Sequence, residues 1–380
     1  MSKYIKIIFL TAFFFLISLP FVQTLWPFLP ETSLNGVVFE DKVFNFSWSS
    51  WFTGDFQKYF DEWLGNHLGL RAYFVKTDNQ LNFSLFQEIS QKTNAPIVIG
   101  RNNQLYEKGY IDDYESPEIM APGDIENKVK NIKVLQNLVE SRGKKFMVLL
   151  SPSKAAIYPE YLPLGVTKYQ GDKLTNYNIY RDLLDKYKVS YFDSHVYLSS
   201  LKQSSPYVLF AKGGIHWNYL GACLVSAQLF YNLDESDPNW PQISCTDIEI
   251  LQSARKEDRD LADLINIWQE EIFYEPLPYP RPRIINNSTY RPRLLIVGGS
   301  FIWNILRVVK EAKIIGDSNF YYYFSKNSQY PANTFLPLDK GALNIKEIIE
   351  DHDVVILESN EAGLKDIGFG FIEMAISQFK

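Results

Sequence analysis

Four continuous apolar runs, separated by amphipathic segments, constrain the fold of this chain. They lie within "KKFMVLLSPSK", "VSYFDSH", "RPRLLIVGGSF" and "HDVVILESNE", and helical spacing precedes the first two, over about residues 125–142 and 177–187. Strands that are apolar on both faces are typical of parallel sheets covered by helices on both sides. We therefore predict an α/β fold with a doubly wound, mostly parallel sheet flanked by helices.

The residues that end these strands are the first candidates for a functional site. Ligands of open α/β sheets bind beyond the carboxyl ends of the strands. Those ends carry Ser151, Asp193, the turn from Gly298 to Ser300, and Glu358. The sequence thus directs the search for a site to these four positions and to the residues beside them.

The amino terminus predicts a membrane anchor. Residues 7–22 are almost entirely apolar and follow Lys3 and Lys6. The run is at the short edge for spanning a hydrocarbon core of about 30 Å, and its positive flank keeps the amino terminus inside. A cleaved signal peptide is the alternative, although "LPFVQTLWPF" lacks the small residues that precede a cleavage site. We expect a retained single-pass transmembrane signal anchor over residues 1–28, with the main domain outside the cytoplasm.

A helical segment is expected between the anchor and the sheet. Aromatic residues recur at three- and four-residue steps within residues 51–86, which predicts a helical hairpin whose aromatic stripe forms its core. The stretch "APIVIGRNNQLYEKGY" predicts a short β-hairpin. We assign residues 29–95 to a membrane-proximal helical segment and residues 96–380 to the α/β domain. The proline-rich "EPLPYPRPRIINNSTYRPR" is interpreted as an exposed connection.

Charge and cysteine content exclude some functions. The net charge is −6 and no basic stripe is present, which argues against nucleic-acid binding. The two cysteines, Cys223 and Cys245, do not have zinc-ligand spacing. A disulfide between them is one option if the domain lies outside the cytoplasm. The sequence suggests no metal and no organic cofactor.

Ser300 ends a strand in a pattern that suits a nucleophile. Gly298 and Gly299 precede it, and such glycines permit a tight turn with positive φ and a close backbone approach. A hydroxyl at this strand-to-helix turn is exposed, and backbone N–H groups of the turn can face a developing oxyanion. The alternative is a serine that only caps the following helix.

Two of the four histidines, His195 and His216, are candidates for a base. His195 lies in "FDSH", so that it forms an Asp-x-His sequence with Asp193. His216 lies in "KGGIHWNYLGA", just before the small residues of a packed helix. Taken alone, each histidine is also explained by a structural role.

These segments together resemble the SGNH-hydrolase-like proteins of the alginate O-acetyltransferase group, of the AlgJ and AlgX type. The family pattern has an Asp-x-His-Trp segment followed by Gly-Ala, and later a Gly-Asp-Ser-Phe turn. Here "GIHWNYLGA" and "GGSF" correspond to them. Further similar segments are "GDFQKYFDEWLGNHLGLR", "VIGRNNQLYEKGYIDDY", "SPSKAAIYPEYLP" and "DVVILESNEAGL". The resemblance covers nearly the whole chain after the anchor.

The resemblance implies an SGNH-hydrolase-like fold and a serine mechanism. Ser300 would be the nucleophile and His216 its general base, with the Ser300 N–H and the Gly298–Gly299 turn around the oxyanion. An acyl-serine intermediate is resolved either by water, which is an esterase outcome, or by a sugar hydroxyl, which is a transferase outcome.

The resemblance also implies a biological setting. It implies acetyl transfer to a secreted or cell-surface polysaccharide, on the periplasmic side of a bacterial inner membrane. A membrane-bound acyl-donor partner of the MBOAT type is implied, because acetyl groups must cross the membrane. Two alternatives are a catalytically silent polysaccharide-binding or assembly component and a plain carbohydrate esterase.

Two departures from the family pattern bear on catalysis. Gly214 stands where the orienting Asp is expected, and Gly299 stands where the Asp before the serine is expected. Three explanations are open: a Ser-His dyad held by a carbonyl or water, an acid reaching in from Asp193 or Glu358, or lost chemistry. An alternative alignment would pair Asp193 with His195, but "DSHVYL" lacks the Trp and Gly-Ala of the family segment.

Three side chains are weaker candidates for substrate binding. They are Trp217 beside the histidine, Tyr323 in the alternating "NFYYYFSKN", and Lys154 in "SPSK", which could meet an anionic polysaccharide. Plain packing of the aromatic residues and a solvent-facing lysine are the alternatives.

Overall fold

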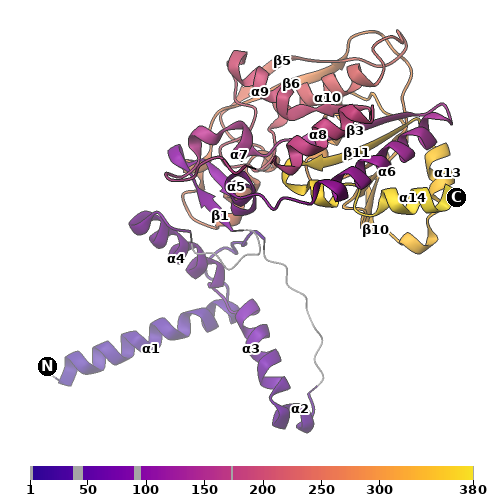
Figure 1. Ribbon diagram of the computed structural model, residues 1–380. Helices are drawn as coiled ribbons and strands as arrows, with labels where there is room; N and C mark the ends of the chain where they lie inside the picture. The colour runs from indigo at the N-terminus through magenta and orange to yellow at the C-terminus, as the bar shows by residue number, and fades with distance from the viewer. Residues whose placement is uncertain (1–2, 37–45, 90–95, 173, 380) are drawn as a thin grey trace. The chain divides into compact units, whose positions relative to one another are not determined.

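The computed structural model describes residues 3–36, 46–89, 96–172 and 174–379 (Figure 1). The chain divides into two compact units. The first comprises Met1–Lys92 together with Ala262–Ile272, and the second comprises Thr93–Leu261 together with Phe273–Lys380. We expected a domain boundary after residue 95. Residues 90–95 lie outside the described residues, so the predicted division into domains stays a prediction.

The first unit begins with α1 (Lys3–Leu25). Over Tyr4–Leu25 its mean hydropathy is 2.4, and none of the most apolar window is buried. Among the described residues it is the one helix long and apolar enough to cross a membrane. It therefore fits the expected single-pass anchor, of which residues 1–2 lie outside the described residues.

The predicted helices after the anchor are present as α2 (Trp48–Thr53), α3 (Asp55–His67) and α4 (Arg71–Phe86). The prediction that their aromatic stripe forms a core is wrong, because α3 has no buried residue. The rings of Phe56, Phe60, Trp63 and His67 instead stack in sequence along the helix and remain partly exposed. Helical spacing gathers side chains on one face, but it does not specify what covers that face.

The segment Ala262–Ile272 joins the first unit through hydrogen bonds between side chains and backbone groups. Asn79 Nδ2 donates to the carbonyl oxygens of Ile265 (3.0 Å) and Asn266 (3.2 Å). The backbone N–H of Asn35 donates to Asn266 Oδ1 (2.8 Å). This unit is thus built from two stretches that are far apart in the sequence.

The second unit is built on a seven-stranded sheet in the order β10-β9-β8-β7-β11-β3-β4. The five strands from β8 to β4 are parallel, and β9 and β10 add an antiparallel edge. In the register, Val354 of β11 lies opposite Leu294 of β7 and Lys145 of β3. The bounds are β3 (Lys145–Ser151), β4 (Tyr191–Asp193), β7 (Leu294–Gly298), β8 (Ser318–Tyr322), β9 (Lys326–Tyr330), β10 (Thr334–Pro337) and β11 (Val354–Asn360).

Helices cover both faces of this sheet, which confirms the predicted doubly wound α/β fold (Figure 1). Alternate residues of each strand enter opposite cores: Ile296 packs into one and Val297 into the other. One core is covered by α9 (Ser194–Ser204), α10 (Tyr219–Leu233) and α12 (Ile302–Glu311). The other is covered by α6 (Pro122–Glu140), α8 (Asn176–Lys186), α13 (Ile345–Glu350) and α14 (Phe371–Phe379).

Two small antiparallel pairs accompany the main sheet. The predicted hairpin is confirmed as β1 (Ile97–Ile99) and β2 (Leu105–Glu107), joined by η1 (Arg101–Asn103). The second pair, β5 (Ile243–Leu251) and β6 (Leu277–Ile284), includes the proline-rich stretch that we interpreted as an exposed connection. That interpretation is wrong for β6, because its prolines occupy alternate positions of a strand that pairs on one side only, where no N–H is needed.

Cys223 of α10 and Cys245 of β5 form a disulfide, with their Cα atoms 5.9 Å apart. The bond ties the small β5–β6 pair to a core helix. The remaining short elements are α5 (Lys108–Glu115), α7 (Lys154–Ile157), η2 (Pro159–Tyr161), η3 (Lys256–Asp258), α11 (Asp260–Ile265), η4 (Glu270–Phe273), η5 (Lys340–Ala342) and η6 (Glu361–Asp366).

Candidate active site

Ser300 lies at the carboxyl end of β7, in the turn before α12. It lines a cavity of about 340 Å³, together with Tyr323, Glu358 and Asn360. The Ser300 side chain does not cap α12, whose N-terminus has no side-chain cap. Its hydroxyl is instead hydrogen-bonded to a histidine.

That histidine is His216, whose Nε2 lies 2.7 Å from Ser300 Oγ. Contacts on both sides hold the His216 segment against the start of α12. Trp217 Nε1 donates to the carbonyl oxygen of Phe301 (3.2 Å), and Asn304 Nδ2 donates to the carbonyl oxygen of Trp217 (2.9 Å). These bonds fix the imidazole beside the serine.

Asp260 completes a triad that the sequence did not predict. Its Oδ2 lies 2.8 Å from His216 Nδ1, and its Oδ1 accepts the backbone N–H groups of Ile215 and Leu261 (2.9 Å each). A carboxylate held in this way orients the imidazole and stabilises the imidazolium that forms when the histidine takes a proton. The local sequence "KEDRDLADL" offers several acids, and nothing in it singles out this one.

The geometry at Gly214 explains why the acid comes from elsewhere. A Cβ at this position would lie 3.1 Å from the carbonyl oxygen of Asp258. The chain that carries Asp260 therefore passes where a side chain at position 214 would begin.

Glu358 does not orient His216, which corrects one of our two expected acids. Its Oε2 accepts the backbone N–H of Gly299 (2.7 Å), beneath the turn that presents Ser300. A Cβ at Gly298 would lie 2.7 Å from the same oxygen. The glycines are needed for this close approach and not for positive φ, which neither adopts. We expected the Gly298–Gly299 turn to contribute to the oxyanion site. The Gly299 N–H does not do so, because it is bonded to Glu358.

Burial raises the pKa of Glu358 to about 7, and the hydrogen bond from Gly299 opposes this rise. Between the ordinary value of 4.5 and about 7, the folded protein therefore binds more protons at this position than the unfolded chain. Its contribution to stability is complete below about pH 4.5 and is lost as the pH rises through about 7.

We predict that Glu358→Gln flattens this pH dependence. In wild type, the free energy of unfolding should fall by about 3 kcal/mol over this window because of Glu358. A glutamine stays neutral and keeps an oxygen for the Gly299 N–H. Urea unfolding at about pH 4.5 and about pH 7.5 measures the difference, with the exposed Glu373→Gln as control. Equal pH slopes in wild type and Glu358→Gln would refute the prediction.

Asn360 is a second residue that sequence reasoning missed. Its Oδ1 accepts the backbone N–H of Ala362 (3.1 Å), whereas its buried Nδ2 has no hydrogen-bond partner among the described residues. Asn360 lines the Ser300 cavity. A donor without a partner, in a residue that lines the same cavity as Ser300, is a candidate to stabilise an oxyanion there. Its place at the end of β11, two residues after Glu358, was the available signal.

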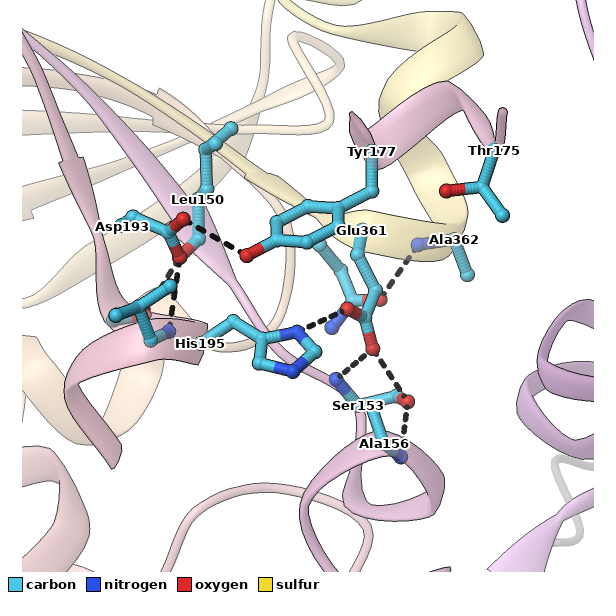
Figure 2. A network of polar contacts seen from close by, with 12 residues as sticks. Leu150, Ser153, Ala156, Thr175, Tyr177, Asp193, His195, Glu361 and Ala362 are labelled. Carbon is cyan, nitrogen blue, oxygen red and sulfur yellow. Dashed lines mark hydrogen bonds and ion pairs between the residues drawn. The ribbon is translucent and has the colours of Figure 1, made fainter. Parts of the chain in front are cut away.

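Asp193, the other expected acid, does not bond His216 and instead caps α9. It caps α9 by accepting the backbone N–H of Val196 (3.1 Å), and it accepts the hydroxyl of Tyr177 (2.8 Å), as Figure 2 shows. The alternative Asp193–His195 pair does not form either. His195 Nδ1 lies 2.7 Å from Glu361 Oε2 instead, because the capping role turns Asp193 toward the backbone of α9.

We expected Lys154 to be a candidate for substrate contact, but the structure gives it a structural role. It is 2% exposed, and its Nζ lies within 2.7–3.2 Å of four backbone carbonyl oxygens, those of Leu105, Ala211, Lys212 and Gly214. Burial lowers its pKa to about 7. The ammonium group thereby holds the loop that leads to His216.

The two aromatic candidates differ. Trp217 is fully buried, so the expectation that it contacts substrate is wrong; its indole positions the loop instead. Tyr323 is 43% exposed and lines the Ser300 cavity, so it stays a candidate.

No group of three or more His, Cys, Asp or Glu side chains within the described ranges could hold a metal ion.

Comparison with known families identifies the family of this chain. The family model described as "SGNH hydrolase-like domain, acetyltransferase AlgX" matches residues 97–290, more than half of the chain. The chain belongs to this AlgX family. His216 and Asp260 lie within the matched residues, and Ser300 follows them.

Known relatives of this AlgX-family protein are distant. The probable alginate O-acetylase AlgJ of Pseudomonas aeruginosa is 23% identical over 260 residues, which are 61% of this chain and 62% of the relative. The chain thus spans less than two thirds of that relative. The O-acetyltransferase domain of Pseudomonas putida AlgJ has a TM-score of 0.47 at 15% identity, covering 75% of this chain and 100% of that one. Bacillus cereus PatB1 has a TM-score of 0.43 at 12% identity, covering 71% and 97%.

Proposed function

We propose that this protein transfers an O-acyl group, acetyl, to a secreted or cell-surface polysaccharide through an acyl-enzyme at Ser300. The observation that carries the proposal is the unbroken relay from Asp260 through His216 to Ser300, with contacts of 2.8 and 2.7 Å. This relay supports an active site in spite of Gly214, and it argues against a catalytically silent binding component. Membership of the AlgX family supports acetyl as the acyl group.

The first half of the reaction acylates the serine. Ser300 Oγ attacks the donor carbonyl while His216 Nε2 takes the hydroxyl proton, and Asp260 stabilises the imidazolium. The tetrahedral oxyanion receives hydrogen bonds from the Ser300 N–H and from Asn360 Nδ2. The intermediate collapses when His216 gives the proton to the departing oxygen of the donor, which leaves an ester on Ser300.

The second half decides between transferase and esterase. A sugar hydroxyl gives its proton to His216 Nε2 and attacks the carbonyl carbon of the Ser300 ester. The bond from that carbon to Ser300 Oγ then breaks, His216 returns the proton to Oγ, and the acylated sugar leaves. Water in the same position would release acetate. The half-exposed Tyr323 beside Ser300 offers a ring face for the acceptor sugar.

The proposed location is the periplasmic side of a bacterial inner membrane. α1 would anchor the chain, and a disulfide such as Cys223–Cys245 persists in an oxidising compartment. We include a membrane-bound acyl-donor partner of the MBOAT type in the proposal, because an acetyl group made in the cytoplasm must cross the membrane to reach Ser300.

The test is to trap the acyl-enzyme on the full-length protein in detergent. p-Nitrophenyl acetate serves as donor, intact-protein mass spectrometry detects the ester, and alginate oligosaccharides serve as acceptors. Wild type and the control Ser377→Ala should acquire an acetyl group, and Ser300→Ala should not. Acetylated oligosaccharide indicates a transferase, and free acetate alone indicates an esterase. The same rate of ester consumption in folded wild type and Ser300→Ala would reject the proposal.

A further inference from the structure

A second cavity, of about 590 Å³, lies at the carboxyl ends of β3, β4 and β11. It shares no lining residue with the Ser300 cavity. No step of the proposed acyl transfer uses its side chains. Those that matter here are Asp113, Tyr114, Lys168, Tyr169, His195 and Glu361.

The wall of this cavity holds an imidazole in a fixed position (Figure 2). Glu361 Oε2 lies 2.7 Å from His195 Nδ1, and Glu361 Oε1 accepts both the N–H (2.9 Å) and the hydroxyl (2.8 Å) of Ser153. The ring of Tyr177 stacks on the imidazole, with centroids 4.9 Å apart. His195 Nε2 has no protein partner among the described residues. Its ring is therefore oriented, and one nitrogen is left for a ligand.

Two further polar groups of the cavity are unpaired. Within the described part of the chain, neither Lys168 Nζ nor the half-buried Asp113 carboxyl has a hydrogen bond or an ion pair. Burial raises the pKa of Asp113 to about 6, and the charge of Glu361 adds to this rise. Donors and acceptors without partners in one hollow are what a ligand with several hydroxyl groups requires.

Aromatic faces complete the lining. Tyr114 and Tyr169 come from different segments, which are joined by a hydrogen bond from the Tyr169 N–H to the Tyr114 carbonyl oxygen (2.9 Å). Both side chains are partly exposed. A pyranose presents apolar C–H faces and polar hydroxyl edges, and such a ring matches tyrosines flanked by an imidazole, a carboxyl and an ammonium group.

The two cavities are lined by different residues of the same two segments. Helix α5 gives Tyr110 to the Ser300 cavity and Tyr114, one turn later, to the second cavity. The segment after β11 gives Ala362 to the first and Glu361 to the second. The two cavities therefore lie beside the same two segments, α5 and the segment after β11. A small acyl donor would not need both cavities, whereas a polymer could use them.

We propose that the 590 Å³ cavity is a binding subsite for one sugar unit of the acceptor polysaccharide. This unit would be a neighbour of the unit that receives the acyl group from Ser300. This inference rests on the proposed function, because it takes its ligand from the acceptor of that reaction. It names the substrate class of the second cavity as a pyranose with free hydroxyl groups.

The experiment measures oligosaccharide binding without turnover. Full-length Ser300→Ala in detergent is titrated calorimetrically with two probes, an alginate hexasaccharide and the neutral cellohexaose. We expect at least one probe to bind, and Tyr169→Ala and Lys168→Ala each to weaken that binding by about ten-fold, equivalent to about 1.4 kcal/mol. A loss in Lys168→Ala confined to the alginate probe would assign the lysine to the sugar carboxylate. The exposed Lys346→Ala, on α13, is the matched control.

Two results would overturn the inference. One is that neither hexasaccharide binds folded Ser300→Ala at millimolar concentration, and the other is that binding is unchanged by both Tyr169→Ala and Lys168→Ala. Because Lys168 is exposed, its variant tests the subsite even if Tyr169→Ala does not fold. Formation of the acetyl-enzyme from p-nitrophenyl acetate is measured separately on wild type, so failure of the subsite and failure of the Ser300 chemistry are distinguishable.

Discussion

Replacing Asp260 by asparagine is expected to lower the turnover of an ester substrate by about 10⁴-fold. Asparagine matches the size of aspartate and can still accept the Ile215 N–H through its oxygen. Its amide group, however, would face His216 Nδ1 with a neutral dipole or a donor in place of the charge. The imidazole would then lose the tautomer that accepts the Ser300 proton, and its protonated form would lose its stabilising partner. Release of p-nitrophenol from the full-length protein measures the loss.

The control for this experiment is Asp247→Asn, which changes an exposed aspartate of β5 that pairs with Arg283 and, among the described residues, has no contact with the relay. It should retain wild-type turnover. Thermal unfolding of both variants shows whether the fold is preserved. If Asp260→Asn retains more than about a tenth of the activity, Asp260 is not the acid of this site, and a Ser-His dyad becomes the better description.

Replacing Asn360 by alanine is expected to lower kcat by about 10² to 10³-fold, the usual cost of removing one oxyanion donor. The buried Nδ2 has no protein partner among the described residues, so its hydrogen-bonding capacity is free for the charge that develops in the transition state. Such an interaction is stronger in the transition state than in the ground state. The expected change is therefore in kcat, with little change in KM, and steady-state kinetics with p-nitrophenyl acetate separates the two.

Asn360→Asp is the matched variant for this prediction. A carboxylate can still accept the Ala362 N–H, which preserves the cap at the start of η6. It cannot donate to an oxyanion. Loss of kcat in both variants would assign the effect to the missing donor, whereas a loss in Asn360→Ala alone would assign it to the cap and contradict the oxyanion role.

The sheet and the proximity of Ser300 and His216 were predictable because their signals are local. The central parallel strands are short apolar runs, and consecutive residues such as Ile296 and Val297, which point to opposite faces, are both buried. Ser300 and His216 each lie in a motif of a few residues, so their roles could be carried over from the family pattern. The structure brings them to 2.7 Å.

Asp260, Glu358 and Lys154 show where sequence reasoning stopped. The acid comes from a position 44 residues after His216, and only the folded path past Gly214 selects it. Glu358 was expected near the site, yet its role beneath the turn depends on the absence of a Cβ at position 298. A lysine after a strand is ordinarily exposed, and Lys154 is buried because four carbonyl oxygens converge on its ammonium group.

The composition of the first unit determines where the chain can be shortened for solution work. The backbone carbonyls of Ile265 and Asn266 accept from Asn79, and the side chain of Asn266 accepts from the Asn35 N–H. Ile265 ends α11, the short helix that begins at Asp260, and Asn266 is the next residue. A soluble version that starts at residue 29 keeps both asparagines. A version that starts at residue 96 deletes them, and we expect the segment Ala262–Ile272 to lose its packing partners in that version.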